Sequence, residues 1–253
     1  MRVQPIFVAI AATFFPIFSA LHAQELHIDA ASDLQPVMPA LAQAYEKKTG
    51  TKLVVSFGSS ATLATQIVNG APVDVFLAAD FSFPEKVVAA DLALEKSPEP
   101  YAKGTLVLWA RKDAAVRPLS MELLTDPRIT RVAVADEFHA PYGRAAYAAM
   151  RWMKTFDTIK PKLAVAENVS QSGQFVESGN AQMGFISLTM ASTAHYKEVG
   201  EFVRVPMVYP EIRQCGVILK NSKNLAGAKA FMIWMLSPEV QNHLKDFGLE
   251  AVN

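Results

Sequence analysis

Two short stretches decide the fold of this chain: Ala30-Ala31-Ser32-Asp33-Leu34 and Phe57-Gly58-Ser59-Ser60-Ala61-Thr62-Leu63. In each, an extended apolar run ends in small residues and hydroxyls, and a helical pattern follows. Pro141-Tyr142-Gly143 and Glu167-Asn168-Val169-Ser170 predict two further helix starts. A helix N-terminus has backbone N–H groups without partners and carries a partial positive charge. If the four starts converge, they form an anion site that needs no metal, lysine or arginine.

Composition excludes several classes of function. The chain has 253 residues, 51% hydrophobic, which is enough to bury one large core or two smaller ones. Its 24 basic and 24 acidic residues balance, so no long-range attraction favours nucleic acid or an anionic membrane. Cys215 is the only cysteine, which excludes an internal disulfide and a two-cysteine metal motif. His27, His139, His195 and His243 have no metal-ligand spacing, so no metal site is expected.

Residues 1–23 have the features of a secretory signal peptide. Arg2 supplies a positive charge, residues 6–18 are almost wholly apolar, and Ala23 is a small residue at the expected cleavage point. The apolar run is shorter than the ~20 residues that a membrane-spanning helix needs, which favours export over a membrane anchor. We therefore expect the mature chain in the periplasm.

The mature chain alternates strand and helix patterns. Residues 36–48 carry a helical apolar stripe that ends at Gly50, and residues 73–79 form an apolar run typical of a buried parallel strand. Such alternation predicts mixed, mostly parallel sheets flanked by helices. Ligands of open α/β sheets bind at the carboxyl ends of the strands, and all four predicted helix starts lie there.

A polar, proline-rich break at residues 95–100 separates two such series, and a strong strand pattern follows it from Thr105. We therefore predict a two-lobed α/β fold with a ligand cleft between the lobes. Residues 24–103 and 217–253 are expected to form lobe 1, and residues 104–216 to form lobe 2.

Five stretches resemble one known family in its order along the chain. Together they cover nearly the whole mature chain, which is far more specific than one short motif. The similarity is to the periplasmic molybdate-binding proteins of ABC importers, which have the type II periplasmic binding protein fold. The stretches are AASDL (30–34), FGSSATLATQIVNGAPVDVFLAAD (57–80), APYGRAAYAAM (140–150), AENVSQ (166–171) and FMIWMLSPEVQNHLKDFGL (231–249).

The resemblance implies a set of ligand-binding residues, in which hydroxyls and backbone N–H groups bind a tetrahedral dianion. The set is Ser32, Ser60, Tyr142, Val169 and Ser187, with Ala31 and Ser59 as possible additional backbone donors. Ser187 departs from the family, which often has a tyrosine there whose hydroxyl completes the site. A serine is shorter and reaches the anion only through water or not at all. This departure leaves a receptor for a different tetrahedral oxyanion or small anion open as an alternative.

The resemblance also implies the ligand and the partner. The ligand is molybdate, and by extension tungstate, with no cofactor. The partner is the membrane permease of an ABC importer, and the receptor is expected to be a monomer that binds no nucleic acid.

Other functions stay open as alternatives from the residues alone. Ser32 and Ser60 also fit ordinary helix N-caps, and Asp74 and Asp80 fit loop-fixing carboxylates better than a catalytic pair. A serine hydrolase would need a Gly-x-Ser-x-Gly elbow, whereas residues 58–62 read Gly-Ser-Ser-Ala-Thr. A transcription regulator of this fold would carry a DNA-binding helix pair in place of the export signal. We therefore expect a binding protein, not an enzyme.

Overall fold

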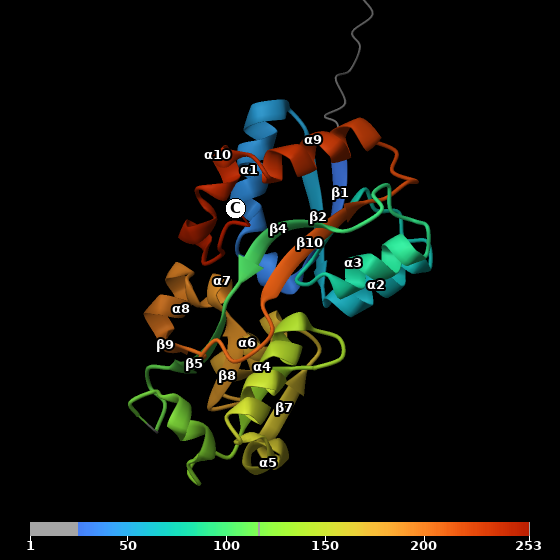
Figure 1. Cartoon of the computed structure of the whole chain (residues 1–253). Coiled ribbons are helices and arrows are strands. Elements are labelled where there is room, and N and C mark those ends of the chain that lie inside the picture. Colours follow the sequence, from blue (N-terminus) through green and yellow to red (C-terminus); the bar gives the residue numbers. More distant parts are fainter. Residues whose placement is uncertain (1–24, 116, 253) are drawn as a thin grey trace, which may run out of the picture.

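The computed structural model describes residues 25–115 and 117–252, so the predicted signal peptide at residues 1–23 lies outside the described residues. Figure 1 shows two lobes, one above the other, each with its own sheet and flanking helices. The predicted two-lobed α/β fold is confirmed. Within the described part of the chain, no helix is long and apolar enough to cross a membrane.

The first lobe has a five-stranded mixed sheet in the order β2-β1-β3-β10-β4. Its three parallel strands are followed by β10, which is antiparallel to both of its neighbours. One face packs against α1 and α9, and the other against α2 and α3. The elements are β1 (Glu25–Ala31), β2 (Lys52–Gly58), β3 (Val75–Ala78), β4 (Glu99–Gly104), β10 (Ile212–Ile218), η1 (Ser32–Leu34), α1 (Met38–Thr49), α2 (Ser60–Val68), α3 (Ser82–Ala89), α9 (Leu225–Met235), α10 (Pro238–Gln241) and η4 (Leu244–Phe247).

The second lobe repeats this plan with a sheet in the order β7-β6-β8-β5-β9. Again three parallel strands are followed by one antiparallel strand, here β5. The elements are β5 (Leu106–Arg111), β6 (Val132–Ala135), β7 (Leu163–Ala166), β8 (Met183–Ser187), β9 (Gly200–Arg204), η2 (Met121–Thr125), α4 (Pro141–Trp152), α5 (Phe156–Ile159), η3 (Lys160–Lys162), α6 (Val169–Glu177), α7 (Leu188–Ala191) and α8 (Ala194–Val199).

The chain passes between the sheets twice, from β4 to β5 and from β9 to β10. β4 covers part of the proline-rich segment that the sequence predicts to be a break. The strand lies at the edge of its sheet, where Pro100 is tolerated because an edge strand has one side free of ladder bonds. β10 starts at Ile212, so the whole strand belongs to the first sheet, although the predicted lobe boundary follows residue 216. Cys215 is buried within it.

The parallel strands of both sheets bring their carboxyl ends to the space between the lobes. β3 and β6 are buried along their whole length, as continuous apolar runs in central parallel strands should be. β1 leads directly into a helical turn, β2 does so after one residue, and β6 and β7 do so after short loops. These four junctions are the helix starts that the sequence predicts.

Candidate oxyanion-binding site

A small cavity of about 10 Å³ lies between the lobes, where the four helix starts meet. Its wall contains no lysine, arginine or histidine among the described residues. The lining residues are Ala31, Ser32, Asp33, Gly58, Ser59, Ser60, Ala79, Ala140, Pro141, Tyr142, Asn168 and Val169. The structure therefore brings together every residue of the predicted set except Ser187.

The first lobe presents two hydroxyls to this cavity. Ser32 is the first residue of η1, and its hydroxyl makes no hydrogen bond within residues 25–115 and 117–252. Ser60 is the first residue of α2, and its Oγ accepts a hydrogen bond from the Ala79 N–H at 3.1 Å, which leaves its own proton free for a ligand. The capping residue of α2 is Ser59, whose Oγ accepts from the Thr62 N–H at 3.1 Å. The alternative that Ser32 and Ser60 are N-caps is therefore wrong.

The second lobe presents backbone donors. α4 begins at Pro141, and the first N–H that bonds within this helix is that of Arg144, to the Ala140 carbonyl at 2.9 Å. The Tyr142 N–H precedes it and has no helical partner. At the start of α6, Asn168 caps the helix by accepting from the Gln171 N–H at 3.0 Å. Val169, the first residue of α6, likewise keeps its N–H for a ligand.

Ser187 lies elsewhere. It is buried at the end of β8, where it caps α7 by accepting from the Met190 N–H at 3.4 Å. Its hydroxyl also lies 2.7 Å from the Thr189 Oγ1, which in turn donates to the Asp33 carbonyl oxygen at 2.7 Å. Both bonding directions of the Ser187 hydroxyl are thus occupied by protein groups. The geometry gives no support to direct contact between Ser187 and an anion in the cavity.

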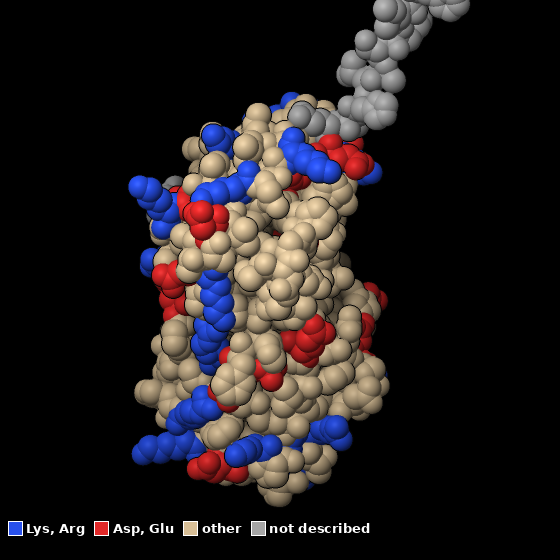
Figure 2. Space-filling model, turned by 90° about the vertical axis from the view of Figure 1, so that its right-hand side faces the viewer, with Lys and Arg blue, Asp and Glu red and all other residues tan. Residues whose placement is uncertain are grey.

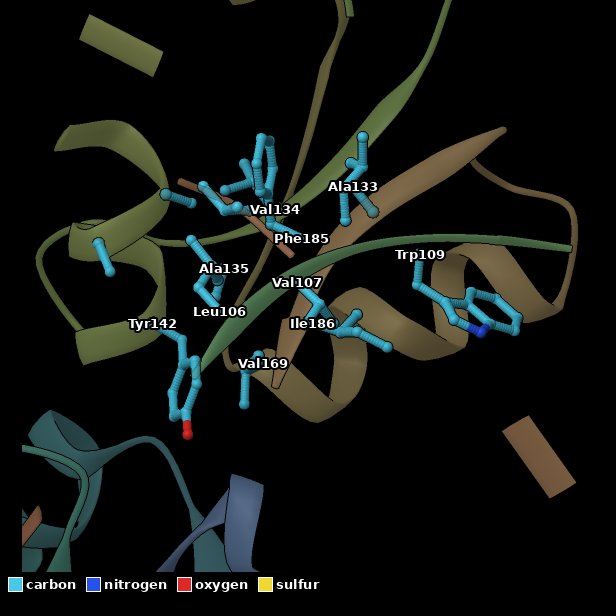
Figure 3. Close-up of a cluster of buried hydrophobic side chains, with 14 of the residues drawn as sticks. Leu106, Val107, Trp109, Ala133, Val134, Ala135, Tyr142, Val169, Phe185 and Ile186 are labelled. Atoms are coloured by element: carbon cyan, nitrogen blue, oxygen red, sulfur yellow. The ribbon is translucent and has the colours of Figure 1, made fainter. Parts of the chain in front are cut away.

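A buried polar cluster adjoins the cavity and joins the lobes. Figure 3 shows Tyr142 at the edge of the second-lobe cluster, with its phenolic oxygen directed away from the other labelled side chains. That oxygen donates to Asp33 Oδ2 of the first lobe at 3.1 Å, and Gln214 Nε2 donates to the same Oδ2. Burial raises the pKa of Asp33 to about 7, although the bonds from Gln214 and Tyr142 oppose the shift. Burial and the nearby Asp33 hold the Tyr142 pKa well above its usual range.

Sequence reasoning missed Asp33 and Gln214 as members of this region. A signal for Asp33 did exist, because it is an acid placed directly after an apolar strand, within the AASDL motif. The sequence carried no such signal for Gln214, because no local pattern indicates that it contacts Asp33, 181 positions away.

Further contacts at the rim hold the two lobes against each other. Arg144 Nη1 donates to Asp80 Oδ2 at 2.8 Å, and the Ala61 N–H donates to the His139 carbonyl at 3.2 Å. Asp80 also accepts from the Phe83 N–H at 3.2 Å, so it holds the first turn of α3 as well as the lobe contact. The Arg144–Asp80 pair is partly exposed, and such pairs contribute about 0–1 kcal/mol. The two lobes are thus in direct contact beside the cavity.

Comparison with known proteins decides the family. The family model described as bacterial extracellular solute-binding protein matches residues 26–250. This chain belongs to that family. The chain is also similar to the molybdate-binding protein ModA of Rhodobacter capsulatus, 37% identical over 81% of this chain and 79% of the relative. The molybdate-binding protein ModA of Azotobacter vinelandii is 33% identical over 90% of this chain and 91% of its own length.

A solved structure agrees with the sequence relatives. The periplasmic molybdate-binding protein of Azotobacter vinelandii superposes on this solute-binding protein with a TM-score of 0.84 at 32% identity. The match covers 90% of this chain and all of the other. The resemblance to periplasmic molybdate-binding proteins that the motifs predict is confirmed.

Proposed function

We propose that this solute-binding protein captures molybdate in the periplasm and delivers it to the membrane permease of an ABC importer. One observation carries the proposal: hydroxyls and helix starts from both lobes line the cavity between the lobes, and its wall includes no cationic side chain. The names of the relatives from Rhodobacter and Azotobacter support molybdate as the ligand. None of these names favours the alternative of another oxyanion.

The proposed contacts all go to the oxygens of the ligand. Ser32 and Ser60 donate through hydroxyls, and Tyr142 and Val169 donate through backbone N–H groups. Each charge-assisted hydrogen bond is worth about 1.5–3 kcal/mol, so four to six contribute about 6–18 kcal/mol before the costs of association and closure. Micromolar affinity needs about 8 kcal/mol, which lies within that range. Molybdate would thus be bound and transported as the intact oxyanion. Tungstate, an oxyanion of the same charge and shape, should bind in the same way.

Selectivity would follow from a wall that has no cation and whose one carboxyl, Asp33, is bound to Tyr142 and Gln214. A lysine or arginine would strengthen binding of every anion, whereas fixed dipoles in a closed cavity select by fit. A protonated anion such as hydrogen phosphate would point its hydrogen at an N–H donor and lose a bond. On the face shown in Figure 2, basic and acidic side chains are interspersed, so the surface there has no field of one sign.

We infer a binding protein without catalytic activity. In a serine hydrolase, Ser60 would be the nucleophile and would need a general base beside its hydroxyl. The group bonded to the Ser60 hydroxyl is instead the Ala79 N–H, which is not a base. We also propose that residues 1–23 direct export of the chain and that the mature protein is a monomer.

Isothermal titration of the chain from Gln24 onward tests the function. Molybdate, tungstate, sulfate and phosphate are titrated at neutral pH. Tight one-to-one binding of molybdate and tungstate is expected, with no heat from the two smaller anions. Tighter binding of sulfate or phosphate than of molybdate would keep the fold and overturn the ligand.

A further inference from the structure

Asp33 receives hydrogen bonds from several elements, two of which belong to the opposite lobe. Tyr142 on α4 and Gln214 on β10 both donate to its Oδ2, and Thr189 on α7 donates to its carbonyl oxygen. Asp33 is fully buried and also lines the anion cavity. Its environment therefore depends on whether the lobes are closed.

Two buried acceptors in this cluster have no partner. They are Asp33 Oδ1 and Gln214 Oε1, and they belong to two groups already joined through Nε2 and Oδ2. Neither can satisfy the other while Asp33 is ionised, because both are acceptors. A proton on Oδ1 would turn one of these two acceptors into a donor, and a carboxylic acid can donate to an amide carbonyl while the amide N–H donates to the other carboxyl oxygen.

The titratable groups that face Asp33 supply no positive charge. Tyr142 on α4 and Tyr101 on β4 are buried phenols whose pKa values are raised, so both are neutral. Cys215 on β10 is a thiol whose pKa burial raises to about 12. Arg144, farther along α4, is bound to Asp80.

The elements packed against η1 add no cation either. β2 and α6 contact η1, but their charged side chains, Lys52 and Glu177, lie at the far ends of these elements. Lys52 is paired with Glu25, and Glu177 with His195. α7 has no charged residue. An ionised Asp33 would thus be uncompensated, in agreement with its pKa of about 7.

We propose that Asp33 is a proton-binding residue of the anion site: it is neutral when the lobes close on a dianion and ionised when they open. Opening removes the bonds from Tyr142 and Thr189 and admits water, which favours the carboxylate. Closing on a dianion adds negative charge beside Asp33 and favours the acid. One proton from solvent joins Oδ1, so each captured dianion adds a net single negative charge to the cleft. The inference rests on the proposed function, since it needs a dianion in the cavity.

Calorimetry measures this proton directly. Molybdate is titrated at pH 7 and 8 in Tris and in HEPES, whose ionisation enthalpies differ, and the buffer dependence of the heat gives the protons taken up. Molybdate is a dianion throughout this range and contributes none. The wild type should take up close to one proton per anion, and its affinity should fall by up to about tenfold per pH unit. Asp33→Asn, whose amide can donate to Gln214 Oε1, should show no uptake and a flat pH profile.

Glu167→Gln is the matched control. Glu167 is an exposed carboxylate that accepts from the Thr62 Oγ1 across the lobes at 3.4 Å, so its removal should leave the uptake unchanged. Uptake that persists in Asp33→Asn, or that is absent in the wild type, overturns the proposal. If Asp33→Asn fails to fold, infrared difference spectra of the unaltered chain decide: molybdate must produce the C=O band of a protonated carboxyl, and its absence overturns the proposal.

The outcomes also separate this inference from the function. Molybdate binding without proton uptake rejects the proton site and keeps the function. Proton uptake with sulfate in place of molybdate keeps the proton site and rejects the ligand. The absence of binding heat with all four anions rejects both the proposed function and the proton site.

Discussion

Gly143→Ala should lower the free energy of unfolding and weaken anion binding. A glycine-to-alanine substitution inside a helix usually stabilises the protein. Gly143 lies in the first turn of α4, and a Cβ there would be 2.4 Å from the carbonyl oxygens of Ala135 and Asp136. Both are backbone atoms at the end of β6, so neither can rotate away. Because ordinary van der Waals contact begins at 3.4 Å, the start of the helix must move by about 1 Å.

The magnitude follows from that displacement. Overpacking of this kind costs about 1–3 kcal/mol of folding free energy. Movement of the Tyr142 N–H by about 1 Å stretches a hydrogen bond from ~2.9 to ~3.9 Å, beyond its useful range. The loss of one charge-assisted bond, about 1.5–3 kcal/mol, weakens anion binding roughly 10- to 150-fold. Helix propensity acts in the other direction, because alanine is favoured over glycine by roughly 0.5–1 kcal/mol.

Urea unfolding and titration with molybdate measure the two effects. Gly173→Ala in α6 is the matched control, because the Cβ there meets the ends of side chains, Met190 Cε at 2.5 Å and Tyr196 Oη at 2.8 Å. These can give way, so binding should stay within about twofold, less than the loss of one hydrogen bond. If Gly143→Ala is more stable than the wild type and binds molybdate equally well, propensity alone governs the site and the steric argument is refuted.

Three further substitutions test the rest of the site. Ser60→Ala should weaken molybdate binding by about 1–3 kcal/mol in calorimetry, through loss of a charge-assisted bond, and wild-type affinity would remove Ser60 from the site. Ser187→Ala should leave the affinity unchanged but lower the free energy of unfolding by about 0.5–2 kcal/mol, because it removes an N-cap; a loss of binding like that of Ser60→Ala would contradict this. Burial in the closed form raises the pKa of Asp33 from 3.8 to about 7, so the closed state retains a proton that the unfolded state has lost, and the contribution of Asp33 to the stability of the closed state should fall by about 3 kcal/mol between pH 4 and 7. Asp33→Asn should lack that fall in urea unfolding, and parallel pH profiles would count against the assignment.

Much of the fold could be read from local patterns. The helix predicted at residues 36–48 and the strand predicted at residues 73–79 appear as α1 (Met38–Thr49) and β3 (Val75–Ala78), because their apolar residues follow the periodicity of each element. β4 was missed because Glu99 and Pro100 mark a break in local terms. Only the pairing with β10 across the sheet edge makes that segment a strand.

The site divides in the same way. Ser32 and Ser60 could be placed because each lies within two residues of the end of a strand, and chain geometry then brings both to the same edge of the sheet. The orientation of the Ser187 hydroxyl could not be predicted, since it depends on a bond to Thr189 and on the start of α7. The partnership of Asp33 with Gln214 depends on the return of the chain through β10.

Tyr142 links the anion, the lobe contact and the crossing between lobes. The backbone N–H of Tyr142 belongs to the cavity wall, while its phenolic oxygen is bound to Asp33. The Tyr142 hydroxyl therefore does not take the place of the tyrosine that the family often has at the position of Ser187. Gly104, at the end of β4 where the chain crosses, makes room for the phenol, since a Cβ there would lie 2.2 Å from its oxygen. Any movement of α4 that draws the N–H from the anion also shifts the phenol from Asp33. Changes at Gly104, Asp33 or Tyr142 should therefore alter affinity and closure together.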